Sequence, residues 1–161
     1  MKITAKEKIA LVTIPIVLAL DQWSKILVLQ KYRLGESRVL IQNFFNFTYV
    51  QNRGAAFSFM HSAPESIRKP FFYVVPLAIL VFLIVIFLRL RPSHKLSALS
   101  LSLIAGGAVG NLIDRIRLGF VVDFIHFHWK EIYHYPMFNI ADSCIVVGAF
   151  LYWISTLKRE H

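Results

Sequence analysis

Long apolar stretches constrain this chain more than any other feature of its sequence. A helix needs about 20 apolar residues to cross the hydrocarbon core of a bilayer. Three stretches of that length carry few or no charges, and a fourth is interrupted by a few polar residues. Because 57% of the residues are hydrophobic, an ordinary soluble domain of this size is excluded. We therefore expect one integral-membrane domain over residues 1–161, with transmembrane helices over 9–29, 70–88, 96–113 and 136–157.

The third stretch is distinguished by its small residues. Between Ser97 and Gly110 it contains three serines, three alanines and three glycines. Small side chains allow membrane helices to approach one another closely. We expect this helix to lie at the centre of the bundle.

The basic residues predict how the chain is oriented. Eight of the 18 lysines and arginines lie in the short segments 1–8, 89–95 and 158–161, and nine are spread over the longer segments 30–69 and 115–135. Dense positive charge marks cytoplasmic segments. Both termini are therefore expected inside and the two longer segments outside. The net charge of +9 gathers at the ends of apolar stretches, which indicates membrane lipids as partners and not nucleic acid.

The two outward segments contain sequences that are typical of β-strands. Residues 38–50 (RVLIQNFFNFTYV) and 120–129 (FVVDFIHFHW) are rich in β-branched and aromatic residues. In an extended strand, Val122 and Asp123 would point to opposite faces. The expected fold class is thus a membrane all-α bundle of four transmembrane helices with a small extracytoplasmic β-structure.

The acidic residues divide into two groups. All five glutamates lie in termini or outward segments, whereas all four aspartates lie in or beside apolar segments. A carboxylate at membrane depth is costly, so each aspartate is a candidate functional residue. The expected topology brings all of them to the outer membrane face. They are Asp21, Asp114, Asp123 and Asp142.

Two of these aspartates have a basic residue close by in the sequence. Asp21 and Lys25 are four residues apart on a helix, which favours an ion pair with a structural or substrate-orienting role. Asp114 precedes Arg115 and can form a helix-end salt bridge with it.

Asp123 and Asp142 have no basic residue within several positions. Two carboxylates brought together share a proton. One can then activate a water molecule while the other donates a hydrogen bond to a scissile carbonyl group. From the residues alone, a catalytic pair and a structural pair are equally supported.

Other functions are less well supported by the sequence. A Ser24–Lys25 hydrolase would need a neutral lysine, which Asp21 disfavours, and a membrane cysteine such as Cys144 usually serves packing. A proton-coupled transporter or assembly factor would place charges near the bilayer midplane and show an internal repeat, and no repeat is visible.

We expect no metal and no cofactor, because no HExxH motif is present. The residues that could suggest a metal are His126, His128, Glu131 and His134.

Five short motifs resemble the lipoprotein signal peptidase (signal peptidase II) family, in the family's order and spacing. Together they cover essentially the whole chain, and no motif position departs from the family pattern. The motifs are Asp21-Gln22-Trp23-Ser24-Lys25, Asn52-Arg53-Gly54-Ala55-Ala56-Phe57-Ser58, Gly106-Gly107-Ala108-Val109-Gly110-Asn111-Leu112-Ile113-Asp114-Arg115, Val122-Asp123-Phe124 and Phe138-Asn139-Ile140-Ala141-Asp142.

The resemblance implies an aspartic endopeptidase of the bacterial inner membrane, with four transmembrane helices and an outward β-cradle. Its substrate would be a prolipoprotein with a diacylglyceryl-modified cysteine, cleaved just before that cysteine without a metal. Asp123 and Asp142 match the family's catalytic aspartates. Further residues match positions that shape the site and hold the substrate, namely Asp21, Lys25, Asn52, Gly54, Asn111, Arg115, Asn139 and Ala141.

Overall fold

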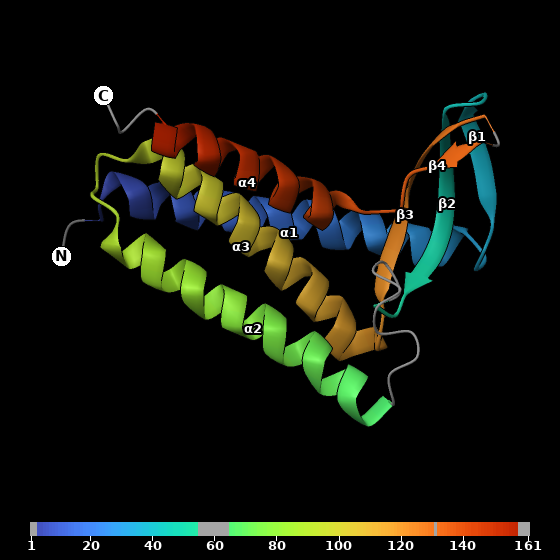
Figure 1. Ribbon diagram of the computed structural model, residues 1–161, viewed down its shortest axis with the longest axis horizontal. Coiled ribbons are helices and arrows are strands. Elements are labelled where there is room, and N and C mark those ends of the chain that lie inside the picture. The colour runs from blue at the N-terminus through green and yellow to red at the C-terminus, as the bar shows by residue number, and fades with distance from the viewer. Residues whose placement is uncertain (1–2, 55–64, 131, 158–161) are drawn as a thin grey trace.

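Four helices form an elongated bundle, and a small antiparallel sheet lies across one of its ends. The computed structural model describes residues 3–54, 65–130 and 132–157. The start of α1 and the end of α4 both lie at the end of the bundle that is remote from the sheet (Figure 1). All four helices are long and apolar enough to cross a membrane. They are α1 (Ala5–Lys31), α2 (Glu65–Arg89), α3 (Lys95–Leu118) and α4 (Ile140–Leu157).

The expected four transmembrane helices are therefore present, and three of them extend beyond their expected bounds. A capping box starts α1 at Ala5: the Thr4 hydroxyl accepts from the Glu7 N–H, and the Glu7 carboxylate accepts from the Thr4 N–H. Helix α3 continues to Leu118, where Gly119 adopts a φ of 79° and ends it. Residues 65–69 and 115–118, expected in outward segments, are thus helical.

The fourth helix begins later than expected, because the residues before it pair with the sheet. Phe138 donates to the carbonyl of Ile125 at 3.1 Å and accepts from its N–H at 2.9 Å. These bonds hold the backbone extended, so the prediction of a helix from residue 136 is wrong. The Asn139 amide oxygen accepts from the Asp142 N–H at 2.9 Å, which makes Asn139 the cap of α4.

Helix α3 lies at the centre of the bundle, as its small residues predict (Figure 1). Close contact depends on the missing side chains. A β-carbon on Gly107 would collide with the carbonyl of Ala141 and would lie 2.8 Å from Ile145, both in α4. One on Gly110 would lie 2.5 Å from the Asp21 carboxylate. The glycines therefore allow α1 and α4 to approach α3 where the aspartates lie.

The sheet contains four strands in the order β1-β2-β3-β4, with antiparallel pairing throughout. The strands are β1 (Ser37–Ile41), β2 (Phe45–Asn52), β3 (Val121–Trp129) and β4 (Tyr133–His134). The stretch 38–50 is thus two strands and not one, because the chain turns at Asn43, whose φ is 61°. The expectation for 120–129 is confirmed as β3.

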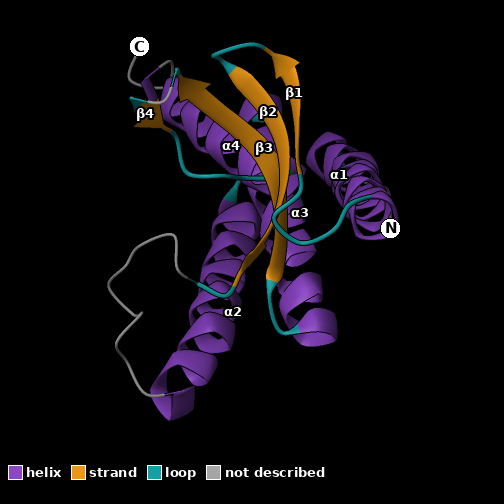
Figure 2. Ribbon diagram, turned by 90° about the vertical axis from the view of Figure 1, so that its right-hand side faces the viewer, coloured by secondary structure: helices purple, strands orange, loops and turns teal. Residues whose placement is uncertain are grey.

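One face of the sheet packs against the end of the bundle (Figure 2). Val122 and Phe124 of β3 form a buried cluster with Tyr49 of β2 and Val28 of α1. Since side chains alternate along a strand, Asp123 lies between these two apolar residues and points to the other side. The cluster fixes β3, and hence Asp123, against the helices.

A larger side chain at Gly107 tests the packing of α3 against α4. We expect Gly107→Val to lower the free energy of unfolding by at least about 1–3 kcal/mol, because the clash is with backbone. The measurement is the thermal midpoint of detergent-solubilised protein. Val146→Leu is the control, since Val146 of α4 is 65% exposed and can accept a larger side chain without a clash. Equal midpoints for Gly107→Val and wild type would contradict this account of the packing.

Candidate active site

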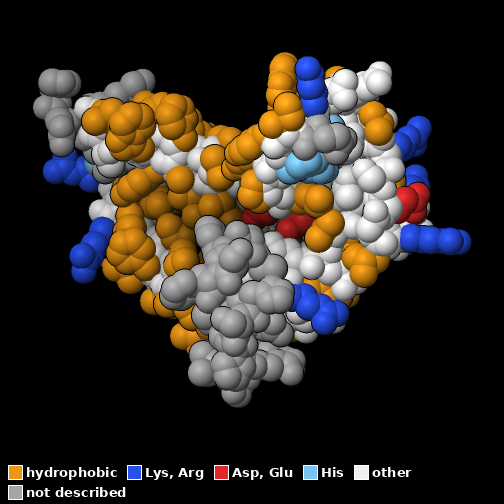
Figure 3. All heavy atoms as spheres, turned by 45° about the vertical axis from the view of Figure 1, so that its right-hand side comes forward, with side chains coloured by type: hydrophobic (Ala, Val, Ile, Leu, Met, Phe, Trp, Pro, Cys, Tyr) orange, Lys and Arg blue, Asp and Glu red, His pale blue; other side chains and the backbone are white. Residues whose placement is uncertain are grey.

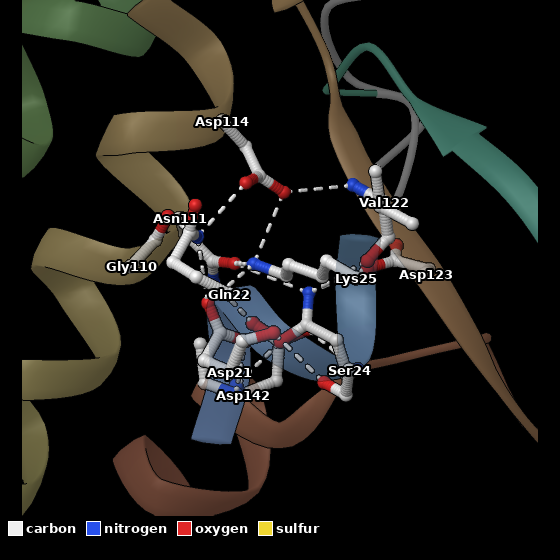
Figure 4. A network of polar contacts seen from close by, with 12 residues as sticks. Asp21, Gln22, Ser24, Lys25, Gly110, Asn111, Asp114, Val122, Asp123 and Asp142 are labelled. Carbon is white, nitrogen blue, oxygen red and sulfur yellow. Dashed lines mark hydrogen bonds and ion pairs between the residues drawn. The ribbon is translucent and has the colours of Figure 1, made fainter. Parts of the chain in front are cut away.

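The four aspartates converge at the end of the bundle that carries the sheet (Figure 4). Asp21 comes from α1, Asp114 from α3, Asp123 from β3 and Asp142 from the first turn of α4. Asp21, Asp114 and Asp123 are each at most 3% exposed. The predicted convergence of the aspartates is confirmed. The site divides into an inner layer, which contains Asp21 and Asp114, and an outer layer, which contains Asp123 and Asp142.

The inner layer is built around the buried ammonium group of Lys25. Its Nζ atom lies 2.9 Å from Asp21 Oδ2 and 3.1 Å from Asp114 Oδ2. The expected Asp21–Lys25 ion pair is therefore present. Asp114 pairs with Lys25 of another helix and not with Arg115, so the helix-end salt bridge considered for it is wrong. Gln22 donates to Asp21 at 3.1 Å and to Asp114 at 3.0 Å, which ties the two carboxylates together.

Each inner carboxylate also holds the backbone just before one of the outer aspartates. Asp21 Oδ1 accepts from the N–H of Ala141 at 3.0 Å. Asp114 Oδ2 accepts from the N–H of Val122 at 3.1 Å. These charge-assisted bonds are among the strong ones in proteins. The Lys25 cluster thus fixes the positions from which Asp123 and Asp142 project.

Asn111 connects Lys25 to Asp142. Its Oδ1 atom accepts from Lys25 Nζ at 2.9 Å, and its Nδ2 atom donates to Asp142 Oδ1 at 2.7 Å. An ammonium group can only donate and a carboxylate readily accepts, so the orientation of the Asn111 amide is determined.

Asn139 joins the two outer aspartates. Its Nδ2 atom donates to Asp123 Oδ1 at 2.7 Å and to Asn111 Oδ1 at 3.1 Å. Its Oδ1 atom accepts from the backbone N–H of Asp142. A single buried amide therefore contacts both Asp123 and Asp142.

Asp123 is held on its other side by Asn52. Asn52 Nδ2 donates to Asp123 Oδ2 at 2.9 Å, while Asn52 Oδ1 accepts from the Gly54 N–H at 2.8 Å. Gly54 has a φ of 92°, which a glycine adopts without strain. Burial and the nearby charge of Asp142 raise the pKa of Asp123 to about 7, against the opposing effect of the Asn52 and Asn139 hydrogen bonds.

An apolar pocket of about 560 Å³ opens beside Asp142. Figure 3 shows acidic side chains at the bottom of a hollow between the apolar surface of the helices and the sheet. Besides Asp142, the pocket is lined chiefly by Phe44, Phe127, Trp129, Tyr135, Phe138, Val146 and Val147.

Arg115 is half-buried. Its Nη1 atom lies 3.4 Å from the carbonyl oxygen of Asn111, and its guanidinium lies over the Phe72 ring at 5.8 Å.

All the site residues that the sequence predicts lie within the described residues, and the structure brings them together. It adds Gln22, which sequence reasoning missed; a polar residue beside Asp21 inside an apolar stretch was the available signal. Part of one motif, Ala55 to Ser58, lies outside the described residues, as does Glu131.

Ser24 and Lys25, the residues of the alternative hydrolase, are bonded to other groups of the protein. Ser24 donates to the backbone carbonyl of Asp21 at 2.8 Å, and Lys25 is paired with two carboxylates. His126 and His134 contact each other at 3.1 Å. Within residues 3–54, 65–130 and 132–157, no group of three or more His, Cys, Asp and Glu side chains is arranged to hold a metal ion.

The fold and the site define a multi-pass membrane protein with carboxylates gathered at one end of a four-helix bundle. The family model described as "Signal peptidase (SPase) II" matches residues 13–158. The chain therefore belongs to the signal peptidase II family, a family of peptidases of the bacterial inner membrane. The resemblance seen in the five motifs is confirmed.

Individual relatives agree with the family. The chain is 46% identical to a lipoprotein signal peptidase of Geobacter sulfurreducens, over 89% of this chain and 88% of the relative. It is 47% identical to a lipoprotein signal peptidase of Shewanella amazonensis, over 90% and 84%. A solved bacterial membrane enzyme superimposes with a TM-score of 0.82 at 31% identity, covering 98% of both chains.

The raised pKa of Asp123 predicts how stability depends on pH. Because the folded protein binds this proton more tightly than the unfolded chain, stability falls as pH rises from about 4, the usual value for a carboxyl group, to about 7. We expect Asp123→Asn to flatten this decline, measured as the thermal midpoint at pH 4.5 and pH 8. Glu36→Gln, in an exposed position, should keep the decline of wild type. Parallel curves for Asp123→Asn and wild type would contradict the raised pKa.

Proposed function

We propose that this protein is an intramembrane aspartic endopeptidase that removes the signal peptide from diacylglyceryl-modified prolipoproteins. Cleavage falls just before the lipidated cysteine. The observation that carries this proposal is the pair Asp123 and Asp142, joined through Asn139 beside an apolar pocket. The names of the relatives, lipoprotein signal peptidases, support the substrate class.

The proposed chemistry is direct attack by water. With a pKa near 7 at Asp123, the pair shares one proton at neutral pH. The ionised carboxylate takes a proton from water as its oxygen attacks the scissile carbonyl carbon, while the protonated carboxyl group donates to the carbonyl oxygen. Collapse of the tetrahedral intermediate breaks the C–N bond, and a carboxyl proton passes to the leaving amine. No metal enters this sequence.

The hydrogen bonds support different roles for the residues around the pair. The polar groups of three residues form ion pairs or hydrogen bonds within the protein, namely those of Asp21, Lys25 and Asn111. In this proposal they position the aspartates and do not touch the substrate. The same holds for the buried Asn139 and Ala141, whose polar groups are also bonded internally.

Asn52, Gly54 and Arg115 are only partly buried, and the proposal gives them contacts with the substrate. An extended peptide beside β2 can meet the backbone at Gly54. The guanidinium of Arg115 is suited to bind carbonyl or ester oxygens. The apolar pocket beside Asp142 suits the lipid-bearing part of the substrate, because its walls are mostly aromatic and aliphatic.

The proposed orientation places the sheet and the carboxylates at the outer membrane face and both termini in the cytoplasm. The charge distribution supports it, since the start of α1 and the short basic segment between α2 and α3 lie at the end of the bundle remote from the sheet (Figure 1). A substrate anchored by its lipid in the outer leaflet would then meet the pair at the level of the headgroups.

Substitution of either outer aspartate tests the catalytic role directly. We expect Asp123→Asn and Asp142→Asn to lower the cleavage rate by at least about 10²–10⁴-fold, because neither variant can share the proton. The assay follows signal-peptide release from a diacylglyceryl-modified prolipoprotein by purified protein in detergent. Glu36→Gln is the matched control. Full activity in both folded variants would refute the dyad, and an inert wild type would refute the substrate.

Asn111 tests the distinction between positioning and binding. We expect Asn111→Ala to lower kcat by about 10²-fold with little change in KM, because Asp142 loses the donor that orients it. Arg38→Ala, an exposed change in β1, should match wild type. A large rise in KM with unchanged kcat would instead assign Asn111 to substrate binding.

A further inference from the structure

A second apolar groove lies between α1 and α3, at the end of the bundle remote from the sheet. It encloses about 570 Å³. Its walls are aliphatic, and a lysine from each helix stands where the helices begin. The residues that matter here are Ile9, Val12, Leu96 and Leu99 for the walls, with Lys8 and Lys95 for the charge.

The two lysines carry positive charge that the described part of the chain does not neutralise. Both are exposed, and the salt bridges found among the described residues all belong to Lys25. Glu7, the carboxylate nearest in sequence to Lys8, accepts from the Thr4 N–H at 2.8 Å as part of the cap of α1. Lys6 turns to the other side, where its Nζ atom donates to three carbonyls at the end of α2.

An apolar groove with cations at one end complements a molecule that has an acyl chain and an anionic head. We propose that one anionic phospholipid, such as phosphatidylglycerol, binds along the α1–α3 groove with its phosphate between Lys8 and Lys95. Lysines at a membrane surface each attract anionic lipid by about 1 kcal/mol. A zwitterionic lipid offers the same acyl chains without the net charge, so binding should select against it. The inference does not depend on the proposed peptidase activity.

The groove lies on the same pair of helices that holds the site. Helix α1 reaches from Lys8 at the groove to Lys25 in the site, and α3 reaches from Lys95 to Asp114. A lipid that bridges the starts of both helices therefore strengthens the contact that the Lys25–Asp114 ion pair makes at their other ends. Bound lipid should raise the thermal stability of the whole bundle.

The test compares lipid binding by two charge-matched double variants. Native mass spectrometry and thermal melts of the detergent-solubilised protein would be recorded with added phosphatidylglycerol and with added phosphatidylcholine. We expect wild type to retain one phosphatidylglycerol and to melt at a higher temperature with it. Lys8→Gln with Lys95→Gln should bind it about 10–30-fold more weakly, from two lysines at about 1 kcal/mol each. Lys31→Gln with Arg33→Gln, at the other end of α1, should behave like wild type.

Each of these comparisons has a result that would overturn the proposal. Equal losses in the two double variants would mean diffuse attraction to surface charge and no site. Equal binding of phosphatidylcholine would remove the role of the lysines. Val12→Trp keeps both lysines and fills the groove, so unchanged lipid binding by this variant would show that the acyl chain lies elsewhere. Equal stabilisation by inorganic phosphate would reduce the site to an anion site without a lipid.

Discussion

The buried ammonium group of Lys25 is the interaction on which the rest of the site depends. A charged lysine that is 1% exposed is strongly destabilising unless it is paired and fully hydrogen-bonded. Asp21, Asp114 and Asn111 supply those partners from two helices. The two carboxylates can also accept further hydrogen bonds. The backbone N–H groups of Ala141 and Val122 donate to them, so the pairing that neutralises Lys25 also docks α4 and β3.

This arrangement explains how a small protein can hold two further carboxylates close together. Asp123 and Asp142 receive donors from Asn52, Asn139 and Asn111. Amide donors are neutral, so they hold the two aspartates in place without the full charge compensation that a lysine would bring. A direct ion pair would lower the pKa of a carboxyl group and keep it ionised. The separation of a charged inner layer from an amide-rich outer layer is therefore consistent with a pair that shares a proton.

Some of this structure could be predicted from the sequence, and the rest could not for identifiable reasons. Apolar length predicts four helices, and the placement of the aspartates predicts their convergence, because both follow from the membrane alone. The partner of Asp114 depends on a distance between two helices, which sequence spacing does not contain. The extended conformation before Asn139 was missed because Phe138 resembles any apolar helix residue until Ile125 supplies its hydrogen bonds. Whether Asp123 and Asp142 catalyse cleavage stays a prediction.

The sheet and α4 meet at Phe138 and Asn139, and this junction has a mechanical consequence. Asp123 belongs to the sheet and Asp142 to the helical bundle, and Asn139 contacts both across the junction. The two carboxylates therefore come from different elements, and the hydrogen bonds of Asn139 hold the sheet against the start of α4. Transmembrane helices change tilt when the hydrocarbon thickness around them changes. A change in the tilt of α4 against the sheet would have to break the Asn139–Asp123 hydrogen bond, so this bond opposes a change in the spacing of the acidic pair.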